Sequence, residues 1–87
     1  MTNDSLIEFP CLFPVKIIGT HTPTFIDEIT QITIKHFPDF EDKNLVHKPS
    51  QKNSYLAITV TVLAQSKELL DAFYQEITKH PQVKMVL

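Results

Sequence analysis

The segment from Tyr55 to Ala64 constrains the fold more than any other part of the sequence, because its residues alternate strictly in character. Every second position is aliphatic: Leu56, Ile58, Val60, Val62 and Ala64. The positions between them are mixed: Tyr55, Ala57, Thr59, Thr61 and Leu63. Successive side chains of a strand point to opposite faces of a sheet, so this pattern predicts a long strand with one wholly apolar face. The domain therefore needs a sheet that is covered on one side.

Other segments supply partners for this strand. Residues 13–19 also alternate, with Lys16 on the outward face and three apolar residues on the inward face: Phe13, Val15 and Ile17. Residues 45–49 form a shorter candidate strand, which Pro49 restricts to a sheet edge. Gln51, Lys52 and Asn53 would form the turn that leads into the long strand.

The C-terminal residues 83–87 form the last candidate strand. A regular alternation predicts that Lys84 and Val86 lie on one face and that the other face holds Val83, Met85 and Leu87.

Two segments have the period of an amphipathic helix. The first begins at Thr22-Pro23, where a hydroxyl can cap free amides, and ends near Phe37-Pro38. Its apolar stripe is Phe25, Ile29, Ile32 and His36, with Ile26 and Phe37 alongside. The second is capped by Ser66 and ends at His80-Pro81. Its stripe is Leu69, Leu70, Phe73 and Ile77.

The element order is strand, helix, strand, strand, helix, strand. It predicts an α+β fold, a ferredoxin-like βαββαβ sandwich in which a four-stranded antiparallel sheet has two helices on one face. At 87 residues the chain suits a single domain, which we expect to span residues 6–87 after a flexible N-terminus of residues 1–5. Residues 6–12 would form an arm before the first strand.

The uncovered sheet face is the first candidate site. By alternation it would present Lys16, Ile18, Tyr55, Thr59 and Lys84. This surface is too apolar for plain solvent contact and too weakly charged for a polyanion, so it predicts a protein partner or self-association, with a homodimer expected. Edge strands offer a second route, by continuing the sheet into another copy.

The connection between the first strand and the first helix is the second candidate site. It contains Gly19, Thr20, His21 and Thr22. Amides at a helix start can bind a carboxylate, so a small ligand such as an amino acid is expected here. Gly19 is the only glycine, and a chain reversal that excludes a side chain would explain it.

Two other functions fit the fold less well. An acylphosphatase-like hydrolase would be expected to hold its phosphate with an arginine, but all eight basic residues here are lysines. An RNA-binding sheet stacks bases on aromatic side chains, and the outward positions of the long strand offer Tyr55 alone. The net charge of -2 also disfavours nucleic acid. Both remain alternatives to a non-enzymatic binding or regulatory domain.

No cofactor, metal or catalytic group is predicted. The four histidines and Cys11 match no ligand spacing of a metal site, and Cys11 between Pro10 and Leu12 is expected to be a small buried hydrophobe. A lone cysteine, the absence of a signal peptide and the absence of a membrane-spanning run together predict a cytoplasmic protein.

Three segments resemble one family. They are Leu6–Pro10 followed by Val15–Gly19; Lys48–Ser50 with Lys52, Asn53 and Tyr55; and the C-terminal Val83–Leu87. Together they resemble the YbeD family of small bacterial proteins, over nearly the whole chain. The resemblance implies a ferredoxin-like fold similar to ACT domains, the small ligand-binding regulatory domains of amino-acid metabolism. Members are often encoded near lipoate-attachment genes, which implies a link to metabolism. The family supplies no catalytic residues to carry over.

Overall fold

The computed structural model describes residues 10–50, 52 and 54–87. The predicted flexible N-terminus, residues 1–5, and the start of the predicted arm, residues 6–9, lie outside the described residues, as do Gln51 and Asn53 of the predicted turn. The elements follow the order β1 (Cys11–Thr20), α1 (Phe25–His36), the short 3-10 helix η2 (Asp42–Asn44), β2 (Leu45–Pro49), β3 (Tyr55–Ala64), α2 (Lys67–Lys79) and β4 (Val83–Val86). The described structure is therefore the predicted βαββαβ sandwich.

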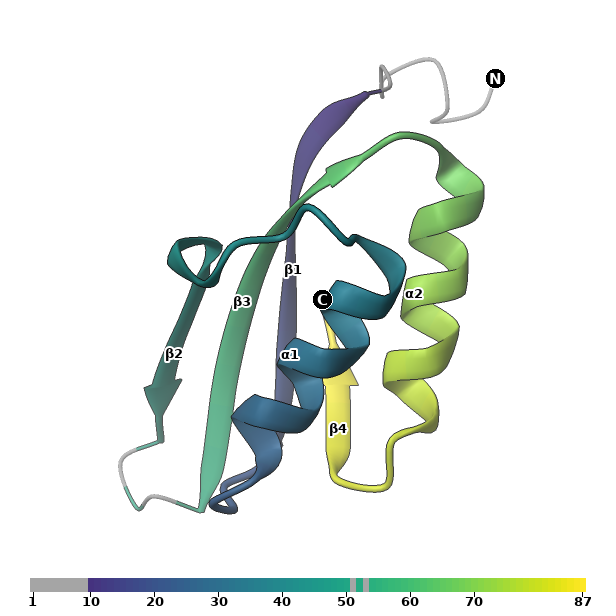
Figure 1. The fold of residues 1–87 in the computed structure, drawn as a ribbon. Helices are drawn as coiled ribbons and strands as arrows, with labels where there is room; N and C mark the ends of the chain where they lie inside the picture. Colours follow the sequence, from purple (N-terminus) through teal and green to yellow (C-terminus); the bar gives the residue numbers. More distant parts are fainter. Residues whose placement is uncertain (1–9, 51, 53) are drawn as a thin grey trace.

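The four strands form one antiparallel sheet in the order β2-β3-β1-β4, and both helices lie on the same face of it (Figure 1). The longest ladder joins β1 to β3, from Cys11 opposite Ala64 to Thr20 opposite Tyr55. β1 begins at Cys11, so the end of the predicted arm is part of the sheet. Cys11 itself is only half-buried.

The core lies between the sheet and the helices. The inward positions of β3 are buried as predicted, and so are Val15 and Ile17 of β1, while Phe13 is partly buried against them. The helices contribute Phe25 and Ile29 from α1 and Phe73 and Ile77 from α2, all fully buried. Every described buried side-chain nitrogen and oxygen has a hydrogen-bond partner. The other face of the sheet has no helix over it in the described chain (Figure 1).

The predicted N-terminal cap is confirmed for α2 but not for α1. Ser66 caps α2 as predicted, because its Oγ accepts a hydrogen bond from the amide of Leu69 over 3.3 Å. The predicted start of α1 was wrong: the helix begins at Phe25, and Thr22 makes no cap but donates its hydroxyl to Gln82 Oε1. The N-cap position is Thr24, whose hydroxyl bonds to the Glu28 side chain instead of a backbone amide.

Candidate functional site

The register of the sheet defines the open face. Lys16 lies opposite Thr59, Ile18 opposite Ala57, and Thr20 opposite Tyr55, so these outward residues of β1 and β3 form one continuous surface. β2 extends it, because Val46 pairs with Thr59 and Lys48 with Ala57. Lys16, Ile18, Tyr55 and Thr59 of the predicted interaction surface therefore lie together on this face.

The contribution of β4 differs from the prediction. Val86 lies opposite Ile17 and Val83 opposite Gly19, and both valines pack against the core. Lys84 is the extra residue of a bulge, since Ile18 pairs with Met85 but the next residue of β1 pairs with Val83. The predicted faces of β4 were wrong because a bulge shifts the alternation by one residue.

Met85 and Leu87 consequently lie on the open face. Met85 is opposite the outward Ile18, and Leu87 exchanges both backbone hydrogen bonds with the outward Lys16, over 3.1 and 2.7 Å. Lys84 is exposed, but no residue of the open face lies opposite it.

The open face gathers the exposed apolar side chains. Seven large apolar side chains are exposed in the described structure, and six of them occupy outward positions of the sheet, with exposed fractions from 46% to 69%. The six are Leu12, Val46, Tyr55, Leu63, Met85 and Leu87. The seventh, Ile34, lies on α1. Sequence alternation identified Tyr55 and Leu63 as outward, but the contributions of β2 and β4 depend on strand pairing.

A hollow of about 230 Å³ lies on the open face beside the hairpin of β2 and β3. Its walls are Ile18, Lys48, Pro49, Ser50, Tyr55 and Ala57. Ser50 fixes this end of the hairpin: its Oγ accepts from the amide of Tyr55 over 3.1 Å, and its own amide donates to the Tyr55 carbonyl over 2.8 Å. The backbone that holds Tyr55 at the rim is therefore anchored.

A second hollow, of about 200 Å³, lies where β1 and β3 extend beyond the end of β2. Leu12, Phe40, Leu63 and Leu69 line it, together with the residues that follow α1. Four separate parts of the chain meet here, so no local sequence pattern signals it.

The predicted ligand loop is shorter than expected. Gly19 and Thr20 belong to β1, and Gly19 is buried opposite Leu56 and Val83. A Cβ added at Gly19 would lie 2.3 Å from a ring carbon of Phe25 and 2.5 Å from the carbonyl oxygen of Gln82. The glycine is therefore required by close packing and not by a chain reversal, which corrects the prediction.

The remaining loop residues face neighbouring protein groups. The amide of exposed His21 donates to the carbonyl of Ser54 over 3.2 Å, and Thr22 is bonded to Gln82. The start of α1 also has a carboxylate of its own, because Glu28 accepts from the hydroxyl of Thr24 over 2.8 Å. An anionic ligand at this helix start would meet the negative charge of Glu28.

The histidine His80 joins the end of α2 to the start of α1. Its Nε2 lies 2.6 Å from Glu28 Oε1, and its Nδ1 accepts from the amide of Gln82 over 3.1 Å. A neutral imidazole that accepts at Nδ1 carries its proton on Nε2, so it donates to Glu28. The hydrogen bonds from Thr24 and then from His80 hold the pKa of Glu28 below its ordinary value.

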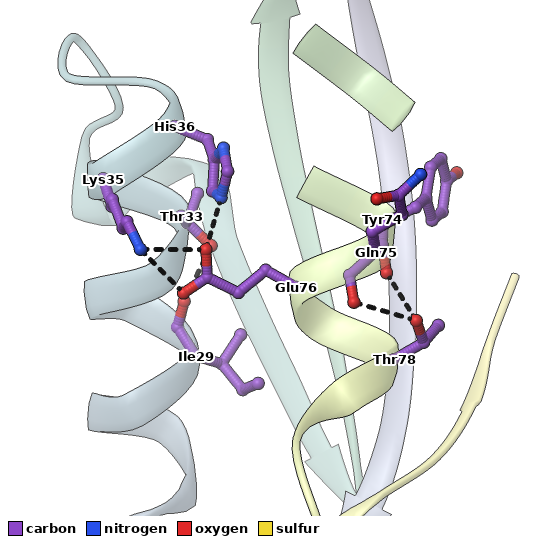
Figure 2. A network of polar contacts seen from close by, with 8 residues as sticks. All are labelled: Ile29, Thr33, Lys35, His36, Tyr74, Gln75, Glu76 and Thr78. Carbon is purple, nitrogen blue, oxygen red and sulfur yellow. Dashed lines mark hydrogen bonds and ion pairs between the residues drawn. The ribbon is translucent and has the colours of Figure 1, made fainter. Parts of the chain in front are cut away.

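A second carboxylate joins the helices further along (Figure 2). Glu76 reaches from α2 to α1, where His36 Nε2 lies 2.8 Å and Lys35 Nζ 3.1 Å from its Oε1. The hydrogen bonds from His36 and then from Lys35 lower the pKa of Glu76. Both histidines are thus engaged by carboxylates of the helix layer, and this layer is a structural unit.

No group of three or more histidine, cysteine, aspartate or glutamate side chains suited to a metal ion occurs among the described residues. Over the same residues, neither helix has the length and apolar content needed to cross a bilayer.

The sequence matches the family described as "Protein of unknown function (DUF493)" over residues 4–87. A UPF0250 protein of Leptothrix cholodnii is 43% identical over 85 residues, which cover 98% of this chain and 93% of the relative. A UPF0250 protein of Nitrosomonas europaea is 41% identical over 87 residues and is covered completely, as is this chain.

Two solved structures have similar folds. Protein HP0495 from H. pylori aligns with a TM-score of 0.73 at 17% identity, over 100% of this chain and 94% of that one. The ACT domain from the GTP pyrophosphokinase of Chlorobium tepidum aligns with a TM-score of 0.69 at 17% identity, over 88% of this chain and 83% of that one. These likenesses concern the fold.

Proposed function

Because the chain belongs to the DUF493 family, the YbeD-type UPF0250 proteins with an ACT-like fold, we propose that it is a small non-enzymatic domain that binds another protein through its open sheet face. One observation supports this proposal above all others. Six of the seven exposed large apolar side chains of the described structure lie on that face. Such a concentration of apolar surface is typical of an interaction site.

The energetics favour a covered face. Each Å² of apolar surface removed from water contributes roughly 25 cal/mol, and the open face holds Leu12, Val46 and Leu87, each exposed over more than half of its surface. The outer side of the helix layer exposes only Ile34 among the large apolar side chains described. A partner that covers the sheet face would therefore remove more large apolar side chains from water, and gain more binding free energy, than one that covers the helices.

The alternatives that the sequence left open have less support. The predicted small-ligand loop is partly occupied, since Gly19 is packed against Phe25 and Glu28 lies at the helix start. RNA would find Tyr55 as the only aromatic side chain among the described outward positions of the sheet. A hydrolase of acyl phosphates would lack an arginine.

The predicted homodimer uses a different surface in this proposal. β2 and β4 are the edges of the sheet, and pairing of an edge with a second copy would leave the open face free. Self-association and partner binding are then compatible.

Site-specific photo-cross-linking in the native host tests the proposal. A photoreactive amino acid is placed at Val46 or Met85 on the open face, and at Gln31 or Thr78 on the exposed side of the helices as controls. We expect discrete adducts with another protein from both open-face positions and none from the controls. Adducts from the helix positions alone, or adducts of only twice the chain mass from Val46 and Met85, would overturn it.

A further inference from the structure

The charges of this chain are divided between its two layers. Of its ten acidic residues, Asp4 and Glu8 lie outside the described structure, and the other eight all lie in the helices or in the connection between α1 and β2. None of the eight lies in a strand. The described strands instead contain lysines: Lys16 in β1, Lys48 in β2 and Lys84 in β4. The sheet is thus cationic although the whole chain has a net charge of -2.

The lysines of the two layers also differ in their partners. Three of the four lysines on the helix side, Lys35, Lys43 and Lys67, each form an ion pair with a carboxylate at 3.0 to 3.2 Å, and Lys79 forms none with a described residue. Lys16 and Lys48 form no ion pair with any described residue. They lie in adjacent rows of the open face, one on central β1 and the other on edge strand β2. Between them are the small side chains of Ala57 and Thr59.

Lys48 also forms part of the wall of the hollow on the open face, next to Tyr55, Pro49 and Ile18. This arrangement puts an ammonium group beside an apolar depression. A bound polypeptide would therefore place an apolar side chain in the hollow. A carboxylate on a neighbouring residue of that polypeptide would be attracted to the ammonium group of Lys48. Tyr55 forms an aromatic wall of the hollow, and tyrosine side chains are enriched in binding hot spots.

These observations decide between occupants of the face. A second copy docked face to face would bring Lys16 and Lys48 against a surface on which no aspartate or glutamate side chain is described, and burying charges without partners is costly. Nucleic acid would lack stacking partners beyond Tyr55. We infer that the open face binds an acidic polypeptide segment, in which apolar anchor residues are flanked by aspartate or glutamate. This inference rests on the proposed protein-binding function and names the partner's chemistry.

Selection from a random 12-residue peptide library displayed on phage tests the inference without assuming a partner. The immobilised full chain is the bait, and peptides are then measured as soluble synthetic probes. We expect enriched peptides to combine an aromatic or aliphatic residue with neighbouring acidic residues. Their dissociation constants should rise at least tenfold for Lys16→Glu/Lys48→Glu and should also rise with salt.

The matched control is Lys43→Glu/Lys79→Glu, which makes the same charge change on the helix side. It should leave peptide affinity within about twofold of wild type, because a Debye length of about 8 Å screens distant charges at physiological salt. Thermal unfolding of both variants establishes that each is folded. Tyr55→Ala reports on the hollow independently of charge and should also weaken binding.

Each other outcome has a definite meaning. Neutral or basic peptides whose binding is lost with Tyr55→Ala would refute the acidic partner while leaving the protein-binding face intact. Peptides that bind the open-face variants as well as wild type would refute both proposals. Failure to enrich any peptide, or tight binding of anionic vesicles or single-stranded oligonucleotides instead, would also refute the acidic polypeptide.

Discussion

Gly19 shows how one residue couples the sheet to the helix layer. It lies inside β1, not at a turn, and its missing side chain leaves room for the ring of Phe25 and the carbonyl of Gln82. Phe25 is fully buried at the start of α1, and Gln82 precedes β4. The absence of a Cβ therefore lets three segments meet. From the sequence alone, the glycine was explained by a chain reversal, because these contacts are long-range.

We predict that Gly19→Ala destabilises the fold by about 1–3 kcal/mol, the usual cost of overpacking a core. The added methyl has no free direction because Gln82 contributes backbone and Phe25 a buried ring. The free energy of unfolding, from urea titration, measures this cost. Phe25→Leu in the Gly19→Ala background should recover part of it, so the double-mutant cycle should show coupling. Strictly additive effects would mean that the ring is not what limits the space.

At the scale of elements, strands with regular pairing could be predicted and the irregular one could not. The alternation of β3 gave its buried face correctly, because a continuous ladder with β1 preserves the period of two. In β4 the same argument failed at Lys84, the bulged residue. Nothing local marks that bulge, which arises where β4 pairs with Gly19 of β1. The apolar contribution of Met85 and Leu87 to the candidate site was missed for this reason.

The helix starts and the hollows also divide into features that the local sequence predicts and features that it does not. Ser66 acts through its own next turn, so its cap was predictable from the local sequence. Thr22 instead bonds to Gln82, sixty residues away in the chain, and α1 begins later. The hollow beside Tyr55 likewise needs β1, β2 and β3 together. The start of α1 and the hollow depend on contacts between residues that are far apart in the chain. A local sequence pattern carries no information about such contacts.

A matched pair of substitutions tests the faces of β4. Val86→Asp places a charge on the covered side, where Val86 is partly buried against the core, and should cost about 1–3 kcal/mol. Met85→Asp, on the adjacent but exposed residue, should change stability by less than about 1 kcal/mol. Urea unfolding of both variants provides the comparison. If Met85→Asp were the more destabilising of the two, β4 would have the regular alternation predicted from the sequence, without a bulge at Lys84.

At the scale of the whole molecule, two carboxylates tie the helices into one layer. Glu28 of α1 is bonded to His80 beyond the end of α2, and Glu76 of α2 is bonded to His36 and Lys35 at the end of α1 (Figure 2). The two links use opposite ends of α1, so they resist separation of the helices at both ends. This layer covers one side of the sheet, and no described helix covers the other side.

The sign of the pH dependence follows from these links. The pKa of Glu28, lowered by Thr24 and His80, and the pKa of Glu76, lowered by His36 and Lys35, both lie below the ordinary value of 4.5 in the folded chain. A depressed carboxyl pKa adds stability that is fully present above the unfolded-state pKa, and this stability is lost as pH falls through the folded-state value. Acid should therefore weaken the helix layer below about pH 4.5.

We predict that Glu28→Gln/Glu76→Gln lowers the free energy of unfolding near neutral pH and makes its decline in acid shallower than in wild type. Glutamine cannot ionise, so the variant has lost both the favourable charge and its titration. Urea unfolding at a series of pH values from about 7 to about 3 measures the two slopes. Glu68→Gln is the control, since Glu68 lies on α2 without an ion pair to any described residue. If the double variant retained the wild-type acid slope, other carboxylates would govern acid unfolding and the links would not join the helices energetically.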